Sequence, residues 1–181
     1  ELRRRLHGHG LRLRTGPLVF RIRSVVPEVE RGLAALYADY PADEQAFADF
    51  DVSVQPVGGL RRWWRPQLHF GIDGQQPFSP LPGDQGLPML EWGMNWCATG
   101  HAHDHLILHS AVVERGGRAM LLPAPSGSGK STLCAALVLS GWRLLSDELA
   151  LIEMDRGRLV PMPRPVSMKN ASLEVIRGLD R

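Results

Sequence analysis

The sequence lacks any run of about eighteen apolar residues, so it predicts no membrane-spanning helix. It has only two cysteines, Cys97 and Cys134, and no apolar segment follows its first arginines as it would in a signal peptide. Both features predict reduced thiols and a cytoplasmic protein. The net charge of +2 calls for neither a nucleic acid nor a membrane as partner, and we expect neither.

The first 86 residues predict a small α+β domain. Residues 1–15 are basic and glycine-dotted, which indicates a loose or amphipathic lead-in. Apolar residues alternate at 18–23, 50–54 and 68–72, as in half-buried strands, and Pro27 suits the start of a helix that ends before Pro41. Asp73–Gly74 is a hairpin signal. We therefore predict a small antiparallel sheet with one helix over residues 1–86.

Residues 87–181 are predicted to form the second domain. A helix is expected at 87–99, an apolar strand at 106–114, a turn at Gly116–Gly117 and a strand at 119–122. A helix at 130–140 and a strand at 142–145 follow, and we expect this last strand to lie beside the strand at 119–122. Beyond it, residues 161–170 carry three prolines and indicate an extended loop.

A candidate phosphate-binding loop connects the strand at 119–122 to the helix at 130–140. Gly127 and Gly129 permit backbone torsions that turn successive N–H groups inward, and the new helix adds its positive end. Lys130 is expected to reach the outer phosphates of a nucleotide, and the Ser131 hydroxyl to hold Mg²⁺. The usual pattern is G-x-x-x-x-G-K-[ST], and Ala124 stands at its first glycine. The loop residues are Ala124, Pro125, Ser126, Gly127, Ser128, Gly129, Lys130, Ser131 and Thr132.

Two acids, Asp147 and Glu148, follow the strand at 142–145. A phosphoryl-transfer site needs an acid beside Mg²⁺ and often a second group that takes the proton from an acceptor hydroxyl. Adjacent acids at a strand end could divide these tasks, or they could form a solvated turn. His109 lies on the strand before the loop, where a histidine is more often structural than catalytic.

Two further clusters have competing interpretations. His101, His103 and His105 form H-A-H-D-H, which could bind zinc, but a polar loop is the favoured interpretation because no clean fourth ligand is evident. The segment Arg61–Arg62–Trp63–Trp64–Arg65 could stack on bases. It has no second basic stripe beside it, so a solvated hairpin edge is favoured.

The order of His109, Gly116–Gly117, the loop and the pair Asp147–Glu148 resembles the catalytic domain of HPr kinase/phosphorylase, and more closely the group called HprK-related kinase A. The resemblance implies a P-loop domain similar to phosphoenolpyruvate carboxykinase, with ATP and Mg²⁺ as cofactors. It places Asp147 near Mg²⁺ and gives Glu148 the position of the base. It also places His109 in the active site and, through the segment 173–178, adds Glu174 beside the metal.

We therefore predict an ATP-dependent kinase, with Lys130 on the phosphates and Ser131 and Asp147 on Mg²⁺. The acceptor is expected to be a hydroxyl, serine above all, of a protein or peptide. The resemblance also implies a PqqD-like peptide chaperone as partner and a homo-oligomer. Because the chain opens at Glu1 and stops at Arg181, soon after a new helix is expected, we predict a fragment of a longer protein.

Two alternatives use the same loop. A P-loop ATPase switch would hydrolyse nucleotide without an acceptor, and a GTPase would carry N-K-x-D, which this sequence lacks. A degenerate module would bind nucleotide and a peptide partner without turnover. Ala124 and Glu148 are the residues that favour this second alternative.

Overall fold

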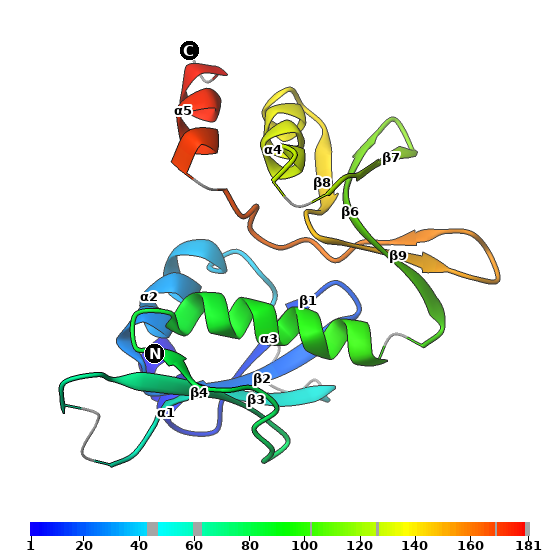
Figure 1. The fold of residues 1–181 in the computed structure, drawn as a ribbon. Coiled ribbons are helices and arrows are strands. Elements are labelled where there is room, and N and C mark those ends of the chain that lie inside the picture. Colours follow the sequence, from blue (N-terminus) through cyan, green and yellow to red (C-terminus); the bar gives the residue numbers. More distant parts are fainter. Residues whose placement is uncertain (43–46, 60–62, 102, 126, 169, 180–181) are drawn as a thin grey trace. The chain divides into compact units, whose positions relative to one another are not determined.

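A computed structural model describes residues 1–42, 47–59, 63–101, 103–125, 127–168 and 170–179 (Figure 1). These residues form a mixed α/β structure with two sheets and five helices. The chain divides into two compact units, Glu1–His101 and Ala102–Arg181, and each is described by itself. In the described residues no helix combines the length and the apolar character that a membrane crossing needs.

The sheet of the first unit has the order β1-β2-β3-β4-β5. Its strands are β1 (Leu11–Thr15), β2 (Leu18–Ser24), β3 (Phe50–Pro56), β4 (Gln67–Ile72) and β5 (Leu81–Pro82). The predicted strands at 18–23, 50–54 and 68–72 are confirmed. The purely antiparallel sheet is wrong, because β2 and β3 run parallel. Between these two strands α2 (Pro27–Leu36) returns the chain to the same end of the sheet, as a parallel crossover requires.

The first fifteen residues are structured rather than loose. They form α1 (Leu2–His7) and the edge strand β1, which pairs antiparallel with β2. Leu6, Leu11 and Leu13 are buried in the core of the first unit. In β1 the side chains of Leu11, Leu13 and Thr15 are buried and alternate with two partly exposed arginines. The many basic residues of the segment had obscured this alternation.

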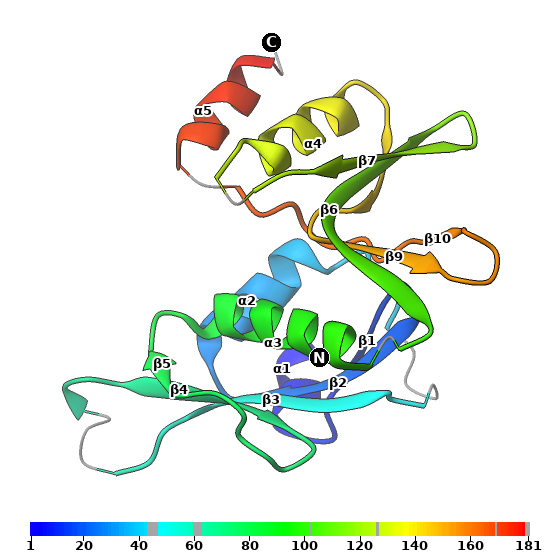
Figure 2. The same ribbon diagram turned by 45° about the vertical axis from the view of Figure 1, so that its right-hand side comes forward.

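Helix α3 (Gly86–His101) belongs to the first unit, although we predicted the domain boundary between residues 86 and 87. Met89, Leu90, Met94 and Cys97 are buried in its core, and α3 lies beside α2 on the sheet (Figures 1 and 2). Gly93 permits this packing, because a Cβ there would lie 2.2 Å from Cε2 of Phe70. The boundary therefore follows the apolar face of α3 rather than the proline-rich stretch before it.

The second unit is built around one long strand, β6 (His105–Arg115). Along one edge β6 pairs with β7 (Arg118–Pro123), and along the other with β8 (Arg143–Ser146) and β9 (Leu149–Glu153), all antiparallel. β10 (Leu159–Val160) continues the sheet beyond β9. We predicted that β8 lies beside β7, and this is wrong: β6 lies between them. The tight turn before β7 returns the chain along one edge of β6 and leaves the other edge for β8.

Two helices complete the second unit. α4 (Lys130–Leu139) packs on β6 through Cys134, which lies in a buried cluster with Ala111 and Val113. α5 (Asn170–Leu179) packs beside α4 (Figure 2). Thr132 Oγ1 donates a hydrogen bond of 2.7 Å to Ser172 Oγ. These contacts hold the start of α4, and hence the end of the candidate loop, against the sheet.

Candidate functional site

The candidate phosphate loop spans residues 124–132, between the end of β7 and the first turn of α4. Gly127 and Gly129 have φ angles of 82° and 89°, in the left-handed region that glycine adopts without strain. In the described residues no side chain caps the first turn of α4, so its N–H groups remain available to an anion. Ser128 stabilises the loop from within, because its Oγ donates a hydrogen bond of 2.7 Å to the carbonyl oxygen of Pro125. Ser126 lies outside the described residues.

Alanine at the first glycine position does not strain this loop. In the described part of the chain, Asp73 is the only residue other than glycine with a positive φ. Ala124 therefore has a backbone conformation that any residue adopts. The departure from the usual glycine pattern leaves the conformation of the loop intact.

His109 and Lys130 come together at the end of the loop. Lys130 Nζ lies 2.9 Å from His109 Nε2. A lysine ammonium group has only donors, so Nε2 of His109 is the acceptor when Lys130 is charged. Lys130 is the first residue of α4 and His109 lies in β6, so the packing of α4 on the sheet creates the pair.

Asp147 lies in a break between two strands that both pair with β6. β9 pairs with residues 105–109 of β6, and β8 with residues 112–114 after a register shift between Val112 and Val113. Such irregularities re-aim side chains and are frequent beside active sites. Here the break places Asp147 beside the first turn of α4, since the Ser131 hydroxyl and the Lys130 charge both act on its carboxyl group.

The Asp147 carboxyl group is buried, with a residue exposure of 7%. Its Oδ2 accepts a hydrogen bond of 3.0 Å from the Ser167 amide, whereas Oδ1 is buried and no donor in the described residues reaches it with hydrogen-bond geometry. Burial raises the pKa of Asp147, against the opposing effects of Ser167, Ser131 and Lys130. A buried carboxylate oxygen without a partner, next to a serine hydroxyl, fits a divalent cation such as Mg²⁺.

Glu148 has a different environment from its neighbour. Its Oε2 lies 3.7 Å from Nη2 of Arg164, and its side chain is 49% exposed. Its backbone carbonyl accepts a hydrogen bond from the Ser110 amide, which ties the break to β6. The acid pair predicted from the sequence is thus divided between two partners, Ser167 for Asp147 and Arg164 for Glu148.

Arg164 and Ser167 are the site residues to which sequence reasoning assigned no role. They lie in the segment 161–168, which the prolines predicted to be an extended loop. The Met162 amide donates a hydrogen bond of 2.9 Å to the Leu145 carbonyl, so the segment starts beside β8. The only signal in the sequence was the basic residue among prolines, which by itself indicates no partner.

Glu174 is not brought into the site by any contact in the described residues. It lies on α5, is exposed, and has no hydrogen bond or ion pair with another residue that the structure describes. The hydroxyl of Thr132, at the end of the loop, donates its hydrogen bond to Ser172 on α5. Of the predicted site residues, the structure therefore groups His109, Lys130, Ser131 and Asp147, with Glu148 adjacent.

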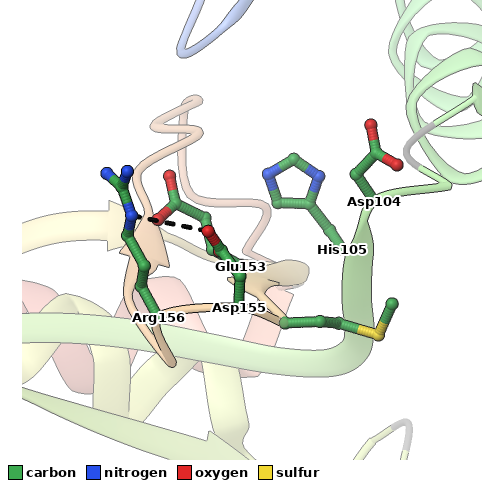
Figure 3. Close-up of a pocket in the computed structure, with 6 residues that line it drawn as sticks. Asp104, His105, Glu153, Asp155 and Arg156 are labelled. Atoms are coloured by element: carbon green, nitrogen blue, oxygen red, sulfur yellow. Dashed lines mark ion pairs between the residues drawn. The ribbon is translucent and has the colours of Figure 1, made fainter.

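The histidine run extends from His101, the last residue of α3, to His105, the first residue of β6. In the parts of the chain that are described, no group of three histidine, cysteine or acidic side chains has the arrangement of a metal site. His105 instead lines a cavity of about 590 Å³ with Asp104, Glu153, Met154, Asp155 and Arg156 (Figure 3). Arg156 pairs with Asp155 there at 3.4 Å.

The basic aromatic segment of the first unit connects β3 to β4. Residues 60–62, which include Arg61 and Arg62, lie outside the described residues. Trp63 and Trp64 are 77% and 83% exposed.

Residues 87–167 match a family model described as SynChlorMet cassette protein ScmC. No curated protein and no solved structure matches the chain. The matched segment covers less than half of the sequence but contains His109, Lys130, Ser131, Asp147 and Arg164.

The predicted resemblance to HPr kinase/phosphorylase and HprK-related kinase A is wrong, because the family model that matches is that of ScmC. The resemblance rested on a few short motifs in a particular order. Short phosphate-binding and acidic motifs recur in many families, so their order alone does not identify one of them.

Proposed function

We propose that the second unit binds Mg·ATP at the loop of residues 124–132 and transfers the terminal phosphoryl group to a hydroxyl group. The acceptor is a serine of a protein or peptide. The observation that carries the proposal is the meeting of Lys130, His109 and Asp147 at the first turn of α4. Phosphoryl transfer uses a cation, a base and an acid beside the metal, and here the Oδ1 atom of the acid has no hydrogen-bond partner in the described residues.

The loop and Lys130 bind the phosphates. The N–H groups of the uncapped first turn of α4 face the anion, and the left-handed glycines keep the loop open around it. Lys130 exchanges His109 for the β- and γ-phosphate oxygens, because a phosphate offers a full negative charge where the imidazole offers a lone pair.

Ser131 and Asp147 are the residues that would hold Mg²⁺. The ion supplies charge neutralisation between the phosphates when it is bound. The Ser131 hydroxyl and the Oδ1 atom of Asp147 are oxygen ligands, which Mg²⁺ prefers, and Ser167 holds the other oxygen of Asp147 in place. The Asp147 carboxylate, directly after β8, would therefore be oriented for the ion before the ion binds.

His109 serves as the base in this proposal. Once Lys130 turns to the phosphates, the Nε2 lone pair of His109 is free at the end of the loop. The acceptor oxygen then bonds to the γ-phosphorus while the bond from that phosphorus to the bridging oxygen breaks. ADP leaves, and the hydroxyl proton passes to Nε2. Glu148, which the sequence suggested as base, is paired with Arg164 instead.

The test is calorimetry of Mg·ATP binding to the full chain as wild type, Lys130→Ala and Arg156→Ala. Arg156 is an exposed cation in the turn after β9 and serves as the charge-matched control. We expect Lys130→Ala to abolish binding and Arg156→Ala to leave it unchanged. Equal binding by all three proteins, or binding by none of them, would contradict the proposal.

A module that binds nucleotide without turnover is the second candidate, and the Glu148–Arg164 pair favours it because the pair occupies the predicted base. Labelled ATP distinguishes the candidates. Transfer of label to a peptide or protein supports the kinase, and release of phosphate without acceptor supports an ATPase switch. Tight binding with neither supports the module.

A further inference from the structure

The segment 161–168 is held against the candidate site at two points. The Met162 amide donates to the Leu145 carbonyl at 2.9 Å, and the Ser167 amide donates to Oδ2 of Asp147 at 3.0 Å. Arg164 lies between these two anchors. The backbone that carries the Arg164 side chain is therefore hydrogen-bonded to Leu145 of β8 on one side and to Asp147 on the other.

The pair between Arg164 and Glu148 is loose. Its N···O distance is 3.7 Å, whereas a charge-assisted hydrogen bond between such groups is about 2.7–2.9 Å long. The Arg164 side chain is buried, with 8% of its surface exposed, whereas the Glu148 side chain is 49% exposed. A phosphate within reach would offer this guanidinium group a closer and more highly charged partner than Glu148 does.

The strongest anion expected in this region is the terminal phosphate of a bound nucleotide. Asp147, next to Glu148, interacts with Ser131 and Lys130 at the start of α4, where the outer phosphates and Mg²⁺ would lie. The guanidinium group of arginine matches phosphate oxygens with two parallel donors, and arginines recur in phosphoryl-transfer sites for this reason.

We propose that Arg164 contacts the γ-phosphate of the bound nucleotide, exchanging Glu148 for it, and so makes the site selective for a triphosphate over a diphosphate. The inference rests on the proposed nucleotide site. Arg164 adds positive charge at the group that is transferred. ADP lacks that group, so Arg164 stays paired with Glu148 when ADP is bound. Product release is then favoured, because the contact that held the triphosphate is absent from the diphosphate.

The experiment compares binding of Mg·ADP with binding of the β,γ-methylene analogue of Mg·ATP by calorimetry, using the full chain. The variants are Arg164→Met, Arg164→Lys and the control Arg158→Met, an exposed arginine at the end of the β9–β10 turn. We expect Arg164→Met to weaken binding of the triphosphate analogue about 10- to 100-fold with Mg·ADP unchanged. Arg164→Lys should fall between, because lysine keeps the charge but not the paired donors.

A second variant covers the case in which Arg164→Met does not fold. Glu148→Gln removes the competing carboxylate and leaves Arg164 in place, so the preference for the triphosphate analogue should rise a few-fold. A merely structural ion pair predicts a different result, because both variants would then weaken the binding of the two nucleotides equally. Equal losses, or no change in the ratio in any variant, would overturn the role of Arg164.

The two proposals fail in different ways. If the wild type binds both nucleotides and the ratio of the two affinities does not change when Arg164 is replaced, the nucleotide site stands and the γ-phosphate contact is wrong. If the wild type binds neither nucleotide, the site itself is wrong and the role of Arg164 falls with it.

Discussion

Lys130 Nζ lies 2.9 Å from His109 Nε2, so the first side chain of α4 contacts a strand residue 21 positions earlier in the chain. The contact joins the first turn of α4, which follows the loop, to the central strand β6. In the proposed function a phosphate competes for the same ammonium group, so ligand binding and release of His109 would be one event.

Replacing His109 with glutamine should separate binding from turnover. The exposed Lys130–His109 pair contributes little, so Mg·ATP affinity should change less than about fivefold. Loss of the base should lower phosphoryl transfer to an acceptor about 10²- to 10⁴-fold. Calorimetry and transfer of labelled phosphate measure the two effects. A loss of binding as complete as that of Lys130→Ala, or an unchanged transfer rate, would contradict the role of His109.

The left-handed conformation of Gly129 makes it sensitive to a side chain. With φ at 89°, Gly129→Ala should lower the free energy of unfolding by about 1 to 2 kcal/mol and weaken Mg·ATP binding as the loop shifts. Gly100→Ala is the control, because Gly100 lies in α3 with nothing close to its would-be Cβ. Chemical unfolding should show no loss for the control. A neutral Gly129→Ala would mean that the loop conformation differs from the one described here.

Burial of Asp147 predicts a stability that depends on pH. Its folded pKa is raised above the ordinary value of 3.8, so the folded protein binds more protons than the unfolded chain between the two values. Stability due to this group is therefore present at low pH and is lost as the pH rises through that window. At neutral pH, Asp147→Asn should raise the melting temperature while Mg²⁺-dependent nucleotide binding is lost.

The control for Asp147→Asn is Asp155→Asn, whose side chain is 73% exposed. Its melting temperature should match that of the wild type at neutral pH. The gain of Asp147→Asn should shrink as the pH falls below 3.8, where both states of the wild type are protonated. A melting temperature lowered by Asp147→Asn at neutral pH would show that the charge of Asp147 stabilises the fold.

Both cysteines should be unreactive in the folded protein. Burial raises the pKa of Cys97 to about 12, and burial together with the charge of Asp147 raises the pKa of Cys134 to about 12. The thiolate is the reactive form, so a thiol reagent at pH 8 should label neither residue before unfolding and both in denaturant. Rapid labelling of either thiol in the native protein would contradict the burial described here.

Local patterns predicted most strands and helices because their information lies within a few residues. The alternation at 18–23 and 68–72 predicted β2 and β4, and the apolar run before Gly116 predicted β6. The loop could also be predicted, since its glycines are needed for torsions that lie within the loop itself. The local pattern did not predict α1 and β1, because arginines interrupt the apolar residues there.

The sequence by itself determined the elements, the loop and the candidate groups Lys130, Ser131 and Asp147. Tertiary structure alone decided that β6 lies between β7 and β8, that α3 joins the first unit, and that Arg164 reaches Glu148. The reason is physical: pairing and packing depend on which surfaces meet, and residues 16 positions apart have no local pattern that links them. A proline-rich segment predicts a loop, but only the hydrogen bonds of Met162 and Ser167 decide what that loop covers.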